Sequence, residues 1–372
     1  MARKMLKVVA GAAALLSLGV GAGVANAAVS SSAPAWKSVS PIGARGEVTA
    51  VTSVIYSGGK VAEFAFVYDG STPSMYARTG NESWALDGVP GAKTGERVVS
   101  AKAIGPNEVL VFTSIKGGHG RVLKMIGHSS SQGGGHTYWR TWTVLRTFNG
   151  QIGSASVLTA DNVWVFGSSA KGAGTLGVWH FNGKTWTQVS KGYTDGSAQS
   201  SKNVWAASGT KLEHWNGSAW TATSIAGLLS TKAATVSTIY TGDGDSPYAV
   251  VSENAKPSGG GGPVVVLEYN GHAWQKVASD PSGSAVEGAA AGDGASGLWF
   301  SVSDAAGKAG QLLHYDNHKH ILSVASVPGL NDALGSAVNS IAQLPGSTKE
   351  LAGGYIIKPA GDPSAARIYS LG

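Results

Sequence analysis

The chain of 372 residues contains no cysteine, and only 13% of its residues are charged. Without cysteine it cannot form a disulfide, a thiolate nucleophile, a Cys-based zinc site or a lipidated N-terminal cysteine. Beyond its first residues the sequence has no block of lysines and arginines, which makes nucleic acid a poor candidate partner. A chain of this size without cross-links depends on core burial and closure for its stability.

The N-terminal segment has the three parts of a secretory signal peptide. Residues 3–7 carry three basic side chains, residues 8–24 are apolar, and residues 25–27 (Ala-Asn-Ala) form a cleavage site. A membrane anchor is the alternative, but the apolar run is short and lacks a basic stop-transfer flank. We expect a secreted, extracellular protein without membrane insertion that begins at Ala28. Cleavage at this site would remove three basic residues and no acidic one, which lowers the formal net charge from +6 to +3.

The 54 glycines and 12 tryptophans favour an all-β fold with many tight turns, and the tryptophans recur in a repeat. The clearest unit, Ser154–Ser190, contains a small-residue segment, a segment DNVWVFG, and two alternating segments joined by Asn-Gly. It recurs from Ser197, and its second half recurs from Val264. Asn-Gly supplies the positive φ of a tight hairpin turn, and alternation with a period of two indicates half-buried strands. Each unit therefore predicts a four-stranded blade.

Weaker copies fill the rest of the chain and bring the total to seven units. Trp, or the residue in its place, stands at positions 36, 84, 142, 186, 220, 274 and about 320. The last unit stops after its third strand, and Pro34–Ser40 (PAWKSVS) matches the missing fourth one. A terminal strand that closes the ring removes both open sheet edges. The sequence predicts one seven-bladed β-propeller over residues 28–372, with six or eight blades as alternatives.

Two observations predict how this propeller is used. The first strands are dominated by Gly, Ala and Ser, as strands that converge on one axis require. The loops between second and third strands and between blades share one face and vary in length, and such loops carry binding on a rigid scaffold. We therefore predict a ligand-binding face on these loops. For each residue taken alone, the alternative is a solvated loop residue without a binding role. The predicted face carries Lys93, Arg97, His119, Arg121, Lys171, Tyr193, Asp195, Lys256, Lys308, Asp332 and Arg367.

The histidines do not predict a metal site. His180, His214 and His314 occupy the same place in three repeats, which indicates a structural role in three different blades. A second group, His119, His128 and His136, lies in one Gly/Ser-rich region, and its spacing matches no familiar metal-ligand pattern. We predict no metal and no cofactor.

Known propeller enzymes match the sequence poorly. Propeller sialidases resemble it in G-x-x-W (Gly183–Trp186, Gly217–Trp220), but the Ser-x-Asp that precedes that Gly is absent. Galactose-oxidase-like propellers need a Tyr–Cys cross-link. Glycosidases need two facing carboxylates, for which Glu47, Glu287 and Asp195 are the candidates near the axis. We predict that the protein is not an enzyme, and keep a carbohydrate-active hydrolase or lyase with loop-face carboxylates as the alternative.

The pattern NVW…EHWNGSAW, from Asn203 to Trp220, resembles the Trp-rich propeller repeats of secreted actinobacterial proteins. The architecture is similar to that of propeller lectin subunits in umbrella toxin particles, which are secreted antibacterial assemblies. The resemblance implies a recognition module, lectin-like or protein-binding. Its partner would be a cell-surface or cell-wall glycan, or a secreted adaptor protein. A structural or cell-wall scaffold is a further possibility.

Overall fold

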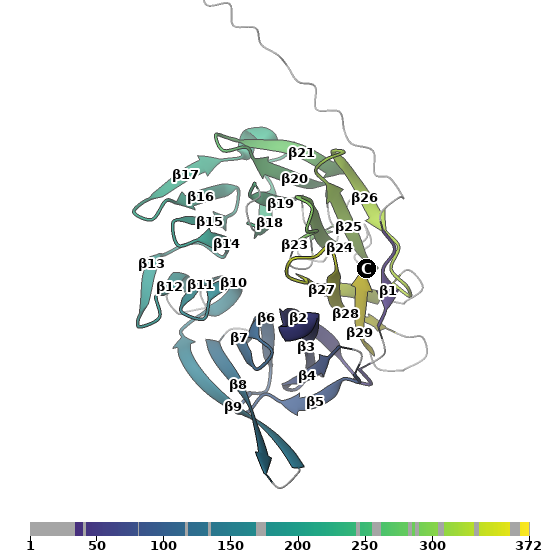
Figure 1. The fold of residues 1–372 in the computed structure, drawn as a ribbon. Helices are drawn as coiled ribbons and strands as arrows, with labels where there is room; N and C mark the ends of the chain where they lie inside the picture. The colour runs from purple at the N-terminus through teal and green to yellow at the C-terminus, as the bar shows by residue number, and fades with distance from the viewer. Residues whose placement is uncertain are drawn as a thin grey trace, which may run out of the picture.

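Seven small antiparallel sheets stand in a ring in the computed structural model (Figure 1). The chain is therefore a seven-bladed β-propeller, which confirms the fold predicted from the repeats. The structure describes residues 34–39, 42–80, 82–115, 118–132, 135–168, 176–242, 246–254, 262–281, 285–286, 290–303, 309–330, 335–357 and 365–371. Within these ranges no helix has the length and apolarity needed to cross a membrane.

Each blade consists of four strands that run outward from the axis in chain order, and the first five blades follow one another along the chain. They are β2(Glu47–Tyr56), β3(Lys60–Tyr68), β4(Pro73–Thr79) and β5(Ala85–Gly88); β6(Glu96–Gly105), β7(Glu108–Ile115), β8(Gly120–Gln132) and β9(Gly135–Phe148); β10(Gln151–Thr159), β11(Asn162–Ser168), β12(Gly177–Phe181) and β13(Trp186–Ser190); β14(Asp195–Ser200), β15(Asn203–Ser208), β16(Lys211–Trp215) and β17(Trp220–Ser224); and β18(Ala234–Tyr240), β19(Tyr248–Glu253), β20(Val264–Tyr269) and β21(Trp274–Asp280).

The last two blades depart from this pattern. In blade six the first strand is split, and in blade seven the outermost strand comes from the N-terminus. The strands are β22(Ala285–Val286), β23(Ala291–Gly292), β24(Leu298–Ser303), β25(Gly310–Asp316) and β26(Ile321–Ala325), then β27(Gly335–Gln343), β28(Glu350–Ile357), β29(Ala365–Leu371) and β1(Lys37–Ser38). Two short 3-10 turns, η1(Ser57–Gly59) and η2(Ala226–Leu228), complete the described elements.

The N-terminal strand closes the ring, as the sequence predicts. Lys37 and Ser38 of β1 pair antiparallel with β29, and the Val39 N–H donates to the Ile368 carbonyl over 2.9 Å. Trp36, immediately before β1, is 2% exposed and meets the ring of Trp299 edge-on, with 5.3 Å between centroids. Only two residue pairs join β1 to the sheet, so the buried indole supplies much of what holds this strand in place.

The hydrophobic core is divided among seven clusters, one between each pair of neighbouring blades. The tryptophans of the second strands, Trp164, Trp205 and Trp299, are each 1% exposed in such an interface. The three repeated histidines stack on them, with ring centroids 4.2–4.5 Å apart. Each histidine Nε2 also bonds, within 2.8–2.9 Å, to the side-chain oxygen of an Asn or Asp in or beside the turn before the second strand. These contacts favour the structural interpretation of His180, His214 and His314.

Small residues and hydroxyl groups join the first strands near the axis. A Cβ atom on Gly196 would lie 2.4 Å from the ring of Phe166, so this position has no room for a side chain. Side-chain oxygens accept hydrogen bonds from backbone N–H groups of the next blade. The pairs are Thr52 with Ala103, Ser156 with Ala198, Ser197 with Thr241, and Ser340 with Val51. The Ser/Thr content of these strands therefore fastens neighbouring blades together in addition to saving space.

Blade two differs from the other blades in the length of its third and fourth strands. In blade two, β8 and β9 form a long hairpin that projects from the ring (Figure 1). The inner neighbour β7 pairs with β8 only as far as Ile126, so residues 127–132 and 135–140 form a two-stranded ribbon beyond the blade. Strand β9 has 14 residues, whereas the outermost strands of the other six blades have 2–7.

Candidate functional site

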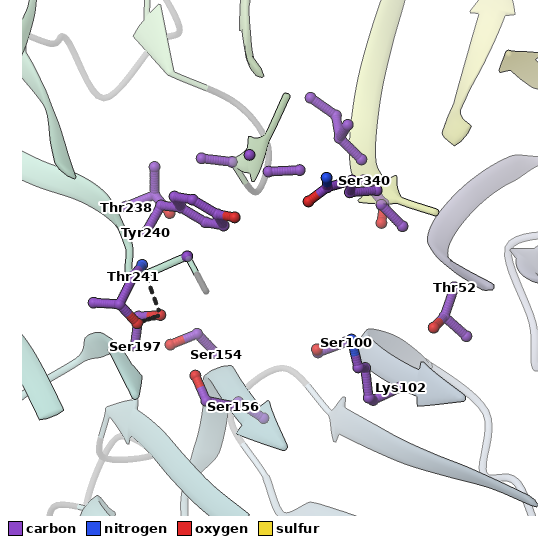
Figure 2. A pocket seen from close by; sticks show the side chains of 18 of the residues that line it. Thr52, Ser100, Lys102, Ser154, Ser156, Ser197, Thr238, Tyr240, Thr241 and Ser340 are labelled. Atoms are coloured by element: carbon purple, nitrogen blue, oxygen red, sulfur yellow. Dashed lines mark hydrogen bonds between the residues drawn. The ribbon is translucent and has the colours of Figure 1, made fainter. Parts of the chain in front are cut away.

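A cavity of about 800 Å³ runs through the centre of the ring and is the candidate functional site. Its wall is formed by the first strands of all seven blades, so the small residues predicted for these strands are the residues that leave the space open. Figure 2 shows hydroxyl groups around this wall, among them Thr52, Ser100, Ser156, Thr238 and Ser340. Ligand pockets in proteins have volumes of roughly 300–1,000 Å³, and the cavity falls in that range.

Two charged side chains stand among the described lining residues, Lys102 on β6 and Asp195 on β14. Burial raises the pKa of Asp195 to about 6. Hydrogen bonds from the Ser154 hydroxyl and from the backbone N–H groups of Gly196 and Ile239 lower the pKa, but by less than burial raises it. One carboxylate oxygen of Asp195 is buried without a described partner. Lys102 is exposed to the cavity, and no ion pair involving it occurs in the described part of the chain.

The predicted ligand-binding residues of blade two surround the start of its first strand. Lys93 is exposed, and its backbone N–H donates to the Glu96 carboxylate over 2.9 Å. Arg97 pairs with Glu47 at 2.8 Å and lies over the ring of Tyr68. His119 is exposed in the loop before β8, where its Nδ1 lies 3.2 Å from the Phe148 carbonyl oxygen.

Arg121 differs from these residues because it is buried. It is 8% exposed, and its Nε donates to the fully buried Glu96 carboxylate over 2.7 Å. Thr113 donates to the same carboxylate. The Arg121 guanidinium therefore stabilises the base of the loop and is largely shielded from solvent.

The other predicted residues lie in different blades and do not converge with those of blade two. Tyr193 stacks on Trp220 in blade four, with 5.7 Å between centroids, two residues before Asp195. Arg367 is half-buried at the start of β29 in blade seven. The remaining predicted residues, Lys171, Lys256, Lys308 and Asp332, lie outside the described residues.

The carboxylates proposed for catalysis are separated in the same way. Glu47 begins β2 in blade one and is engaged by Arg97 and by the Asn339 amide, which donates to it over 3.3 Å. Asp195 begins β14 in blade four, on another side of the ring (Figure 1). Glu287 lies outside the described residues. Glu47 and Asp195 therefore do not form a facing pair on neighbouring strands.

The projecting hairpin carries exposed aromatic residues that sequence reasoning did not select. Tyr138 is 76% and Trp139 46% exposed, and as consecutive strand residues they point to opposite faces of the ribbon. The His128 ring stacks on Trp139 at 5.2 Å, and its Nε2 lies 2.9 Å from the Thr141 hydroxyl. Arg140 pairs with Asp87 of blade one and anchors the ribbon near its base. The signal in the sequence is the aromatic pair beside a Gly/Ser-rich turn, which matches no other repeat.

No protein-family model and no curated protein matches the chain. Among solved structures, Sqt1 from Chaetomium thermophilum is 13% identical to this chain, with a TM-score of 0.50. The match covers 87% of this chain and 83% of the Sqt1 chain. Trypanosoma rangeli sialidase is 10% identical to this chain, with a TM-score of 0.41. The match covers 88% of this chain and 55% of the sialidase chain. The chain thus spans about half the length of the sialidase. At these identities the similarity shows the β-propeller fold alone.

Proposed function

We propose that the protein is a secreted, non-enzymatic recognition module whose central cavity and surrounding loop face bind a cell-surface or cell-wall glycan. The observation that supports this most directly is the hydroxyl-lined cavity of about 800 Å³. Hydroxyl groups both donate and accept hydrogen bonds, and a saccharide presents the same groups in return. As in the lectin subunits that the sequence resembles, such binding would serve a secreted antibacterial assembly.

Blocking the cavity tests this proposal. Ser100 lines the cavity, and no hydrogen bond of its side chain occurs among the described contacts. Ser100→Phe therefore fills space without removing a bond, and we expect it to weaken glycan binding by at least about tenfold, or roughly 1.4 kcal/mol. The measurement is a glycan array of the mature chain, followed by calorimetry with the saccharides that bind.

The control is Thr221→Phe, because Thr221 is exposed on the outermost strand of blade four. It should bind glycans like the wild type, and both variants should keep the wild-type melting temperature within a few degrees. Equal glycan binding by Ser100→Phe and the wild type would rule out the cavity. Hydrolysis of a bound glycan by the wild type would favour the alternative function, a carbohydrate-active hydrolase or lyase.

The projecting hairpin supports a second binding function, toward a secreted adaptor protein. A two-stranded ribbon is marginally stable on its own, and aromatic residues are enriched in protein interfaces. Tyr138 and Trp139 cannot both be covered by a flat partner, because they lie on opposite faces of the ribbon. We expect the partner to enclose the ribbon in a groove.

Replacing both aromatic residues tests this second function. Tyr138→Ser/Trp139→Ser should lose any partner that the wild type captures from the native secretome, while its glycan binding is unchanged. The matched control is Thr221→Ser, an exposed position on another blade. A partner captured equally by both variants does not bind through the hairpin.

A further inference from the structure

Three hydroxyl groups on the cavity wall each accept one backbone hydrogen bond and donate none among the described contacts. Thr52 Oγ1 accepts the Ala103 N–H over 2.9 Å, and Ser156 Oγ accepts the Ala198 N–H over 3.0 Å. Ser340 Oγ likewise accepts a backbone N–H from blade one, over 3.0 Å. Within the described contacts none of these hydroxyls donates to a protein acceptor. Because each hydroxyl has one proton to donate, each is held in place with an O–H that is unpaired among the described contacts.

Lys102 lies at the same level of the wall as two of these hydroxyls. The first strands of blades one, two and three each contain a β-bulge at the corresponding place, and Thr52, Lys102 and Ser156 each stand two residues beyond its last residue. Blade two thus presents an ammonium group where the blades on either side present hydroxyls. Figure 2 shows these three side chains along the same part of the cavity wall, with Ser340 beyond Thr52.

In this arc of Thr52, Lys102 and Ser156 the ammonium group only donates hydrogen bonds, and each hydroxyl has its proton unpaired and one of its two acceptor lone pairs occupied. A neutral saccharide hydroxyl needs an acceptor as well as a donor, whereas a carboxylate, sulfate or phosphate only accepts. Hydrogen bonds to an ionised group are about twice as strong as those between neutral groups. Asp195, the other charged lining residue described, begins the first strand of blade four, which is not a neighbour of blade two. The positive charge at the arc therefore has no described counter-charge.

We propose that the arc binds the oxyanion of an acidic saccharide, that is, a sugar carrying a carboxylate, sulfate or phosphate group. The inference rests on the proposed function and names its ligand class. In this arrangement the Lys102 ammonium pairs with the oxyanion, and the hydroxyls of Thr52 and Ser156 donate to its remaining oxygens. Neighbouring Ser/Thr side chains hold the sugar ring.

The test compares glucuronate, glucose 6-phosphate, glucose and inorganic phosphate as ligands of the mature protein, by calorimetry. We expect glucuronate or glucose 6-phosphate to bind at least about tenfold more tightly than glucose. The two acidic sugars distinguish a carboxylate from a phosphate as the preferred group. Lys102→Gln should abolish this preference, so that glucose and the two acidic sugars bind the variant with affinities within about twofold of one another, a difference below roughly 0.5 kcal/mol.

Lys184→Gln is the matched control, because Lys184 is exposed in a turn on the outer edge of blade three and its removal costs the same charge. It should retain the preference for acidic sugars. An unchanged preference in Lys102→Gln, or equal affinities of the wild type for glucose and both acidic sugars, overturns the inference and leaves the glycan function intact. Phosphate bound through Lys102 without binding of any sugar would support the anion site and overturn the glycan function.

Discussion

Trp36→Ala should lower the free energy of unfolding by about 3–5 kcal/mol, the usual cost of truncating a buried aromatic residue to alanine. The indole is 2% exposed and packs edge-on against Trp299 in the interface between blades six and seven. Strand β1 contributes only two residue pairs to the sheet, so loss of the indole also releases the strand that closes the ring. Urea unfolding of residues 28–372, followed by Trp fluorescence and circular dichroism, measures the effect.

Lys37→Ala serves as the control because Lys37 is exposed on the same strand. Exposed substitutions of this kind change stability by about 0.5 kcal/mol or less. A chain of residues 43–372, which lacks β1, should be destabilised at least as much as Trp36→Ala. If that truncated chain melts no earlier than the intact one, closure by the N-terminal strand makes no contribution to stability.

Glu350→Gln should stabilise the protein, and the gain should increase with pH. Glu350 is 1% exposed, and neither carboxyl oxygen has a hydrogen-bond partner in the described structure. Burial, and then the nearby negative charge of Asp293, raise the pKa of Glu350 from 4.5 to about 9. Above pH 4.5 the unfolded chain gives up this proton while the folded chain keeps it, so stability falls as the pH rises toward 9. Glutamine is neutral in both states and removes this loss.

At pH 7 the expected gain from Glu350→Gln is about 3 kcal/mol, and at pH 4 it should be close to zero. Unfolding free energies measured in urea at pH 4, 6, 7 and 8 give the slope directly. Glu82→Gln is the control, because Glu82 is exposed on the outer side of blade one. A Glu350→Gln variant less stable than the wild type at pH 8 would mean that the carboxylate is ionised in the folded protein and stabilised by a cation.

The fold could be predicted because the same residue types occupy equivalent structural positions in successive blades. Asn-Gly turns, a Trp at the start of the fourth strand and a Trp in the second strand recur at positions such as Trp186, Trp220 and Trp164, Trp205. The structure buries the second-strand tryptophans in equivalent blade interfaces. Repetition thus made the interblade core visible without any knowledge of long-range contacts.

The candidate site was less predictable because its features are departures from the repeat. Lys102 stands where neighbouring first strands have Thr52 and Ser156, but this is apparent only once the β-bulges align the strands. From the sequence, Arg121 is expected to be a charged residue in an exposed loop. Its burial depends on an ion pair with Glu96, which is distant in sequence. The ribbon around Tyr138 arises from a Gly/Ser-rich segment whose composition favours a loop.

The pairing of β1 with β29 has a consequence for the order of folding. The first of the described strands, β1, pairs with the last of them, β29, so their contact joins residues more than 300 positions apart, as Lys37 with Ser370. Contacts between residues far apart in sequence form slowly, because a long loop must be closed before they contribute. Six blades can assemble while the chain is being made, but the seventh has to wait for the residues of β29. In a protein truncated before β29, Trp36 should therefore lose its packing site, and the face of blade six that packs against blade seven should be exposed.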